Sequence, residues 1–201
     1  MALVNLIEES SAPLLLRDLY AGGDPGPIVG ALAQVPELCE VTLPFVGAAL
    51  APSAVSFRDK EIAILRTSAN LSCRYCIDAH TVVAFESGLS DTEVRALRRG
   101  DDAALDSAFA TARDRALVAW IDALSIERGP VPPELGERAR AALGEHQLVE
   151  VTVTVGATIL LNRLASSLHL PTSDATIRQL ADLGFEPFRP PTPVAVEGRP
   201  T

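Results

Sequence analysis

Apolar residues three and four positions apart recur along most of this sequence, and this spacing constrains the fold more than any other feature. It places apolar side chains on one face of a helix, whereas the strict alternation of half-buried strands is almost absent. In the segment 111–127, for example, Leu117, Trp120, Ile121 and Leu124 share one face. The sequence therefore predicts an all-α fold.

Prolines, glycines and capping residues divide this pattern into successive helices. Ser90 and Glu93 have the spacing of a capping box, in which each residue satisfies a backbone donor of the other. Pro44 lies inside the helix that begins at Pro36, so we expect a kink or break there. Helices are expected to begin at Pro36, Arg58, Cys73, Ser90, Thr111, Pro133, Glu145 and Ser173.

The segment 145–168 is ambiguous, because its β-branched residues alternate with polar ones as in a strand. Its length and its lack of turn residues favour a long buried helix. No linker interrupts residues 30–184, so we expect one helical domain over residues 1–184. The tail 185–201 holds five of the 15 prolines, and we expect it to be extended and mobile and able to wrap a neighbouring subunit.

Charge and hydropathy exclude several classes of partner. The 17 Lys and Arg residues against 26 Asp and Glu residues give a net charge of −9, which disfavours binding to nucleic acid or to an anionic membrane surface. The most apolar window, 151–161, is shorter than a membrane-spanning helix, and the first residues lack the pattern of a secretion signal. We therefore expect a cytoplasmic protein without a membrane span.

The segment with the strongest chemical signal contains two of the three cysteines, Cys73 and Cys76. On a helix, Cys76 lies about 60° and His80 about 20° from Cys73 around the axis, so the three side chains share one face. Cys73 lies at the expected start of the helix, where the helix dipole stabilises a thiolate. A thiolate with a second thiol three residues away can form a disulfide after one sulfur has been oxidised.

Other interpretations of this segment stay open. The cysteines can be small core residues, as we expect for Cys39. A zinc site would need a fourth ligand that the sequence does not supply in a matching pair, so no metal is expected. A thioredoxin fold is disfavoured, because both flanks of the segment are helical.

Glu61 lies twelve residues before Cys73, and the combined pattern of Glu61, Cys73, Cys76 and His80 resembles that of the AhpD-like alkylhydroperoxidases of the carboxymuconolactone decarboxylase superfamily. The likeness extends over roughly residues 35–170 and includes the segments 58–65, 88–94 and 160–165. It implies an AhpD-like helical domain and a thiol-dependent peroxidase that needs no metal, haem or flavin. It also implies a homo-oligomer, a trimer or hexamer, and a dithiol reductant such as a lipoylated or thioredoxin-like protein.

The resemblance implies that Cys76 is the peroxidatic thiol and Cys73 the resolving thiol, with Glu61 and His80 as a proton relay. The helix-dipole argument instead gives Cys73 the lower pKa. Here we follow the resemblance, because a buried relay can outweigh a dipole effect of roughly 0.3–1 kcal/mol.

Tyr75 stands where the AhpD enzymes have a histidine. We expect Tyr75 to support the site, but the proton relay then has one base fewer that titrates near neutral pH. Two alternatives to a peroxidase remain at this point. One is a decarboxylase-like enzyme that acts on a small carbonyl or lactone, and the other is a dithiol redox sensor without turnover.

Overall fold

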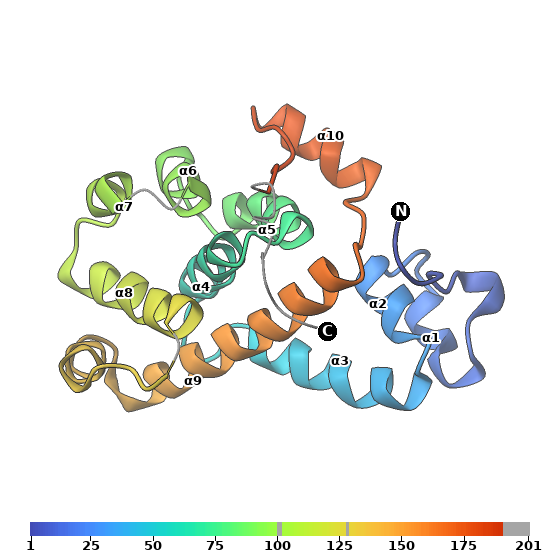
Figure 1. The fold of residues 1–201 in the computed structure, drawn as a ribbon, viewed down its shortest axis with the longest axis horizontal. Coiled ribbons are helices and arrows are strands. Elements are labelled where there is room, and N and C mark those ends of the chain that lie inside the picture. Colours follow the sequence, from blue (N-terminus) through green and yellow to red (C-terminus); the bar gives the residue numbers. More distant parts are fainter. Residues whose placement is uncertain (100–101, 128, 191–201) are drawn as a thin grey trace, which may run out of the picture.

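A computed structural model of the chain describes residues 1–99, 102–127 and 129–190, and these residues form helices without any β-strand, which confirms the all-α prediction. Short 3-10 turns at Glu9–Ser11 and Leu14–Leu16 precede the first α-helix. The α-helices are α1 (Arg17–Tyr20), α2 (Pro27–Leu32), α3 (Pro36–Leu50), α4 (Phe57–Asn70), α5 (Arg74–Glu86), α6 (Asp91–Arg99), α7 (Asp102–Ala108), α8 (Ala112–Ile126), α9 (Pro133–Ser167) and α10 (Asp174–Asp182) (Figure 1).

Helices α4 and α5 lie in the middle of the molecule, with α8 and α9 along one side and α6 on the other (Figure 1). The apolar stripe expected on α4 is buried, since Ile62 and Leu65 are fully covered. Ile77 of α5 and Leu117 of α8 belong to the same core cluster. The core is therefore built around α4, which contacts α5, α6, α8 and α9.

Most of the predicted helix starts coincide with observed caps. The backbone N–H of Ser90 donates to Glu93 Oε2 at 2.8 Å, and the N–H of Glu93 donates to Ser90 Oγ at 3.3 Å, as a capping box requires. Helix α3, however, runs through Pro44 without a break. Pro44 and Glu40, whose carbonyl loses its helical donor, both lie on the exposed side of α3, where water can satisfy that carbonyl.

The strand-like segment 145–168 is helical and forms most of α9. The two helices predicted on either side of Gly144 join there at a kink with φ 75° and ψ 165°. Helix α9 is long and apolar enough by composition to cross a membrane, but it packs against α3, α4, α5 and α8 as a core helix of the bundle does.

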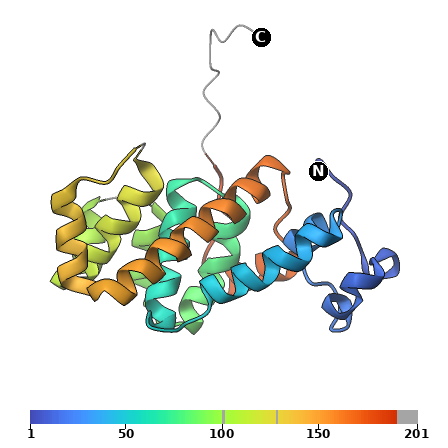
Figure 2. The same ribbon diagram turned by 90° about the horizontal axis from the view of Figure 1, so that it is seen from below.

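Both ends of the described chain lie against the helices. Helices α1 and α2 and the start of α3 form a second, smaller apolar cluster around Tyr20 and Cys39, at the end of the molecule that carries the N-terminus (Figure 2). Cys39 is fully buried, in agreement with its predicted place in a core. Phe185 is also buried, and the N–H of Phe188 donates to Asp78 Oδ1 at 2.7 Å. Residues 185–190 are thus packed against the body, which differs from the mobile tail expected from residue 185, and residues 191–201 lie outside the described residues.

Candidate active site

The connection between α4 and α5 brings the predicted site residues into one region. Only residues 71–73 separate the two helices, and Ser72 takes a left-handed conformation with φ 52° to make this tight turn. Glu61 lies nine residues before the end of α4, and His80 lies six residues after the start of α5. The turn brings the two helices together so that these side chains meet.

Cys73 is the N-cap residue of α5, and Cys76 lies in the first turn of the helix. The Cys73 N–H donates to the Ser68 carbonyl at 3.0 Å, which fixes the start of α5 to the end of α4. Both thiols are free, with the Cys73 residue 1% and the Cys76 residue 6% exposed. Apolar residues of the N-terminal segment, among them Val4 and Leu6, pack over them.

The pKa values of the two thiols are shifted in opposite directions because the Cys76 thiol donates a hydrogen bond to the Cys73 sulfur. A hydrogen bond from the Cys76 thiol, with further ones from the Ser166 hydroxyl and the Cys76 backbone N–H, lowers the pKa of Cys73 to about 6, although burial and the Asp78 carboxylate oppose this change. The pKa of Cys76 is raised, because its proton is held in the hydrogen bond to Cys73 and because burial and the negative charge of Cys73 disfavour a second thiolate. Cys73 is therefore the thiol that ionises first.

Glu61 and His80 form a buried hydrogen-bonded pair. His80 Nδ1 lies 2.9 Å from Glu61 Oε2, and the side chains are 24% and 4% exposed. The carboxylate can hold the ring in one orientation. His80 lies one helical turn beyond Cys76, but neither sulfur is within hydrogen-bond distance of the Glu61–His80 pair. Among the described residues, no group of three His, Cys, Asp or Glu side chains is placed to hold a metal ion.

Tyr75 lies beside the dithiol and cannot replace the missing histidine as a base. Burial, together with the negative charges of Cys76, Cys73 and Asp24, raises the pKa of Tyr75 to about 12. Its hydroxyl therefore stays protonated at neutral pH and can act as a hydrogen-bond donor.

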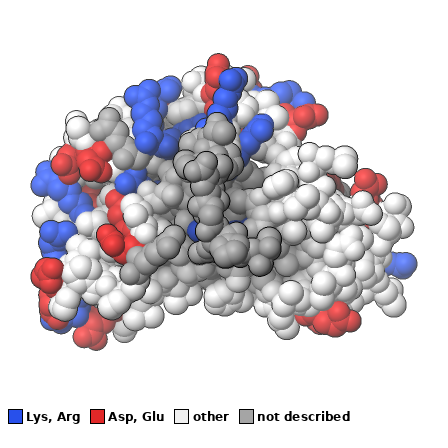
Figure 3. All heavy atoms as spheres, viewed as in Figure 1, with Lys and Arg blue, Asp and Glu red and all other residues white. Residues whose placement is uncertain are grey.

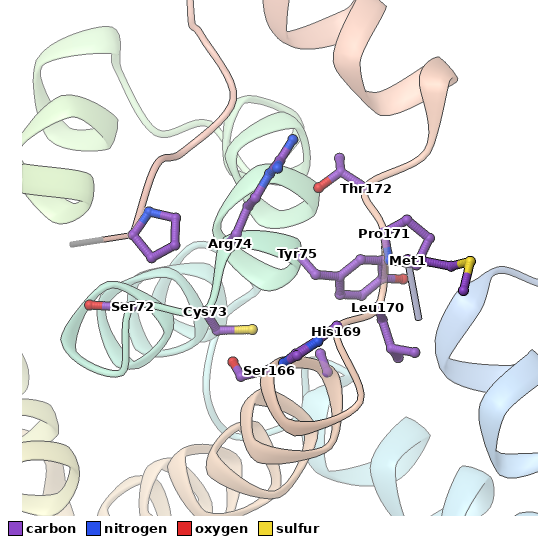
Figure 4. Close-up of a pocket in the computed structure, with 12 residues that line it drawn as sticks. Met1, Ser72, Cys73, Arg74, Tyr75, Ser166, His169, Leu170, Pro171 and Thr172 are labelled. Carbon is purple, nitrogen blue, oxygen red and sulfur yellow. The ribbon is translucent and has the colours of Figure 1, made fainter. Parts of the chain in front are cut away.

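A pocket of about 710 Å³ opens beside Cys73, between the start of α5 and the segment that follows α9. Figure 4 shows the Cys73 sulfur directed toward the side of the pocket that carries Ser166 and His169. Cys76 is not among the residues that line it. Ser72 and His169, the two non-glycine residues with positive φ in the described chain, both line this pocket. Such strained residues gather at functional sites.

The pocket contains functional groups that the sequence did not reveal. Ser166 and His169 come from the end of α9, about ninety positions from Cys73, and Thr172 follows them. Thr172 Oγ1 donates to the buried Asp78 of α5 at 2.9 Å, so it fastens the segment after α9 to α5. No local pattern marks these residues, because their position depends on the packing of α9 against the hairpin.

The carboxymuconolactone decarboxylase family model matches residues 36–122 of this chain. This range contains α3 to α7 and all four residues of the motif, Glu61, Cys73, Cys76 and His80. The search of curated proteins gave no match.

Several solved structures share the fold at low sequence identity. The debrominase Bmp8 in complex with 2,3,4-tribromopyrrole is 17% identical with a TM-score of 0.73, and the match covers 91% of this chain and 98% of that one. An AhpD-core, peroxidase-related protein from Ralstonia eutropha is 16% identical with a TM-score of 0.73, covering 94% and 98%. A peroxidase-related protein from Silicibacter is 16% identical with a TM-score of 0.72, covering 87% and 93%. The family model thus matches the part of the chain that carries the motif, and these solved structures share the fold of most of the chain.

Proposed function

We propose that the protein is a thiol-dependent peroxidase that reduces organic hydroperoxides through a Cys73–Cys76 disulfide. The observation that carries this proposal is a thiol with a pKa of about 6 on the wall of a pocket, hydrogen-bonded to a second thiol. At neutral pH Cys73 is then mostly thiolate, the form that attacks a peroxide. A reducing cytoplasm would keep both thiols available for this chemistry.

The reaction begins with attack of the Cys73 thiolate on the terminal oxygen of the hydroperoxide. The O–O bond breaks, Cys73 becomes a sulfenic acid, and the leaving alkoxide takes the Cys76 proton to become an alcohol. The Cys76 thiolate then attacks the Cys73 sulfur and expels hydroxide, which leaves a disulfide. We assign the proton relay of Cys76 to His80, held by Glu61, and a water would have to bridge the two because no hydrogen bond joins His80 to the sulfur. An external dithiol, lipoylated or thioredoxin-like, reduces the disulfide.

We assign the attack to Cys73, against the role that the resemblance implies. Cys73 lines the pocket and ionises first, whereas Cys76 lies behind it with a raised pKa. Glu61 and His80 keep their place as a relay in this scheme, but they act on the resolving thiol.

The test is consumption of cumene hydroperoxide with dithiothreitol or dihydrolipoamide, combined with mass spectrometry of the cysteines. We expect Cys73→Ser to form no sulfenic acid and Cys76→Ser to form one sulfenic acid at Cys73 and then stop. Cys39→Ser is the matched control, because Cys39 belongs to a separate apolar cluster, and it should turn over like the wild type.

Each contrary result favours a stated alternative. A sulfenic acid on Cys76 in the Cys73→Ser variant would restore the roles implied by the resemblance. A disulfide without turnover would favour a redox sensor. If no disulfide forms, a decarboxylase-like enzyme acting on a small carbonyl or lactone becomes the better account.

A second candidate is reductive dehalogenation, which the likeness to the tribromopyrrole complex of Bmp8 favours. Two thiols can supply the two electrons, so that a carbon–bromine bond becomes carbon–hydrogen while a disulfide and hydrogen bromide form. The aromatic ring of Tyr75 in the pocket suits a flat substrate. Release of bromide from 2,3,4-tribromopyrrole, without peroxide consumption, would favour this candidate.

We also propose that the protein forms a homo-oligomer through α3 and α9. These helices pack side by side, and their outer faces expose Leu38, Val41, Phe45, Val149, Val153 and Leu160. The surface over α1 to α3 is mostly uncharged, whereas charged side chains gather on the side of α6 to α8 (Figure 3). Exposed apolar side chains on neighbouring helices are typical of a subunit interface.

A further inference from the structure

The lining of the pocket beside Cys73 lacks the acidic side chains that predominate in the chain as a whole. The chain carries 26 acidic and 17 basic residues, yet none of the residues that line the pocket in the described structure is acidic. Arg74 and His169 supply a cationic group and an imidazole, and Ser72 and Tyr75 supply hydroxyls, whereas the hydroxyls of Ser166 and Thr172 donate to Cys73 and Asp78. This lining suits a ligand that bears a negative group.

Arg74 lies where it can meet such a group at a distance from the reacting sulfur. Figure 4 shows its side chain extending from the start of α5 toward Thr172, away from the thiol of Cys73. Its side chain is 51% exposed, and its Nε faces Asp78 Oδ2 at 3.6 Å. Among the described residues Arg74 makes no ion pair other than this one with Asp78, and its half-exposed guanidinium can be reached by a ligand.

Asp78 faces Arg74 from behind the lining of the pocket and offsets part of its charge. It is fully buried, and its two oxygens accept hydrogen bonds from the Thr172 hydroxyl and the Phe188 N–H. A carboxylate in the pocket would therefore meet Arg74 and the hydroxyls, and the Asp78 side chain lies behind them.

The rest of the lining is apolar, with Ala165, Leu170, Pro171 and Pro190. The volume of about 710 Å³ falls within the range of about 300–1,000 Å³ typical of sites for small organic molecules. Hydrogen peroxide would leave most of this space unfilled, whereas an organic molecule with an apolar body would fill it.

We propose that this pocket binds an amphipathic organic substrate with a carboxylate, which pairs with Arg74 while the reacting end lies at Cys73. The assignment of a hydroperoxide to that end rests on the proposed function, but recognition of the carboxylate does not. A partly exposed charge-assisted pair of this kind raises the affinity about tenfold over that of a ligand without the carboxylate.

The primary test measures binding without turnover. Alkylation of Cys73 by iodoacetamide is followed by mass spectrometry in the presence of decanoate or of decanol, which share the apolar chain and differ in charge. We expect decanoate to protect Cys73 at a concentration about tenfold lower than decanol does. This difference should disappear in Arg74→Gln, return in part in Arg74→Lys, and persist in Arg138→Gln, an exposed arginine near the other end of α9.

Equal protection by the two probes in the wild type, or an unchanged difference in Arg74→Gln, would overturn the proposal. The result does not depend on peroxidase activity, so its failure is distinct from failure of the proposed function. With an active enzyme, a fatty-acid hydroperoxide should show a KM about tenfold lower than its methyl ester, and Arg74→Gln should raise the KM of the acid alone.

Discussion

The buried face of α4 and the start of α5 lie side by side, but they are held in place by different forces. Helix α4 buries charged side chains and pairs them with residues of other helices: Asp59 with Arg113 at 2.8 Å, Lys60 with Glu150 at 2.7 Å, Glu61 with His80 at 2.9 Å and Arg66 with Asp122 at 2.6 Å. At the start of α5, the Cys73 sulfur has only neutral hydrogen-bond donors around it. The ion pairs fix the position of α4, whereas the neutral donors stabilise a thiolate without neutralising its charge, which leaves it reactive.

Removal of a buried charge from α4 should have the largest effect on stability. Lys60 is fully buried, and its Nζ donates to the Ala49 carbonyl at 2.8 Å and to Thr154 Oγ1 at 2.9 Å in addition to its pair with Glu150. We expect Lys60→Met to lower the free energy of unfolding by about 3 kcal/mol, because Glu150 loses its cation. Urea unfolding measures the change.

Two further variants check the cause of this loss. Arg140→Gln removes an exposed pair with Glu137, and it should leave the unfolding midpoint unchanged. The double variant Lys60→Met with Glu150→Leu should recover part of the loss, because no unpaired charge remains. If Lys60→Met alone costs less than about 1 kcal/mol, the ion pairs do not hold α4 as described.

The thiolate predicts a pH dependence of stability that the ion pairs do not share. The pKa of Cys73 is about 6 in the folded protein against an ordinary value of 9.0. Its contribution to stability is therefore present in full above about pH 9 and is lost as the pH falls through 6. The free energy of unfolding of the reduced wild type should rise between pH 6 and 9 by more than about 1 kcal/mol relative to Cys73→Ser.

This dependence is measured by urea unfolding at a series of pH values in the presence of a phosphine reductant. The difference from Cys73→Ser removes the titration of the histidines, which both proteins share. The raised pKa of Cys76 has the opposite effect only above its ordinary value, outside this range. A parallel pH dependence in the two proteins would show that Cys73 is not a thiolate at neutral pH.

The smallest expected effect is that of a single hydroxyl on the pKa of Cys73. Ser166 donates to Cys73, so Ser166→Ala should raise the pKa of Cys73 by less than about one unit. The rate of alkylation at Cys73 as a function of pH measures this shift. Ser167→Ala, at the exposed neighbouring position, should change nothing, and Lys60→Met should leave the pKa of Cys73 unaltered.

Local residues predicted most helix starts correctly, because a cap acts within one turn of the chain. Ser90 and Glu93 form the expected capping box, and Thr111, an expected helix start, accepts a hydrogen bond from the Asp114 N–H. Of the kink or break expected at Pro44, the structure shows no break: α3 continues, and the carbonyl that loses its donor lies on the exposed side, where water can reach it. The mobile tail expected from residue 185 overlooked Phe185, which packs against Phe85 and under Arg95.

The sequence by itself determined the helical class, the capped starts of the helices and the presence of two thiols within one turn of α5. These features depend on side-chain spacing and on contacts between residues a few positions apart. Only the tertiary structure decided which thiol borders the pocket and which one keeps the proton. The hydroxyl of Ser166 and the covering N-terminal segment come from distant parts of the chain. The pKa of a thiol depends on its burial and on its hydrogen-bond donors, and these are brought together only when the helices pack.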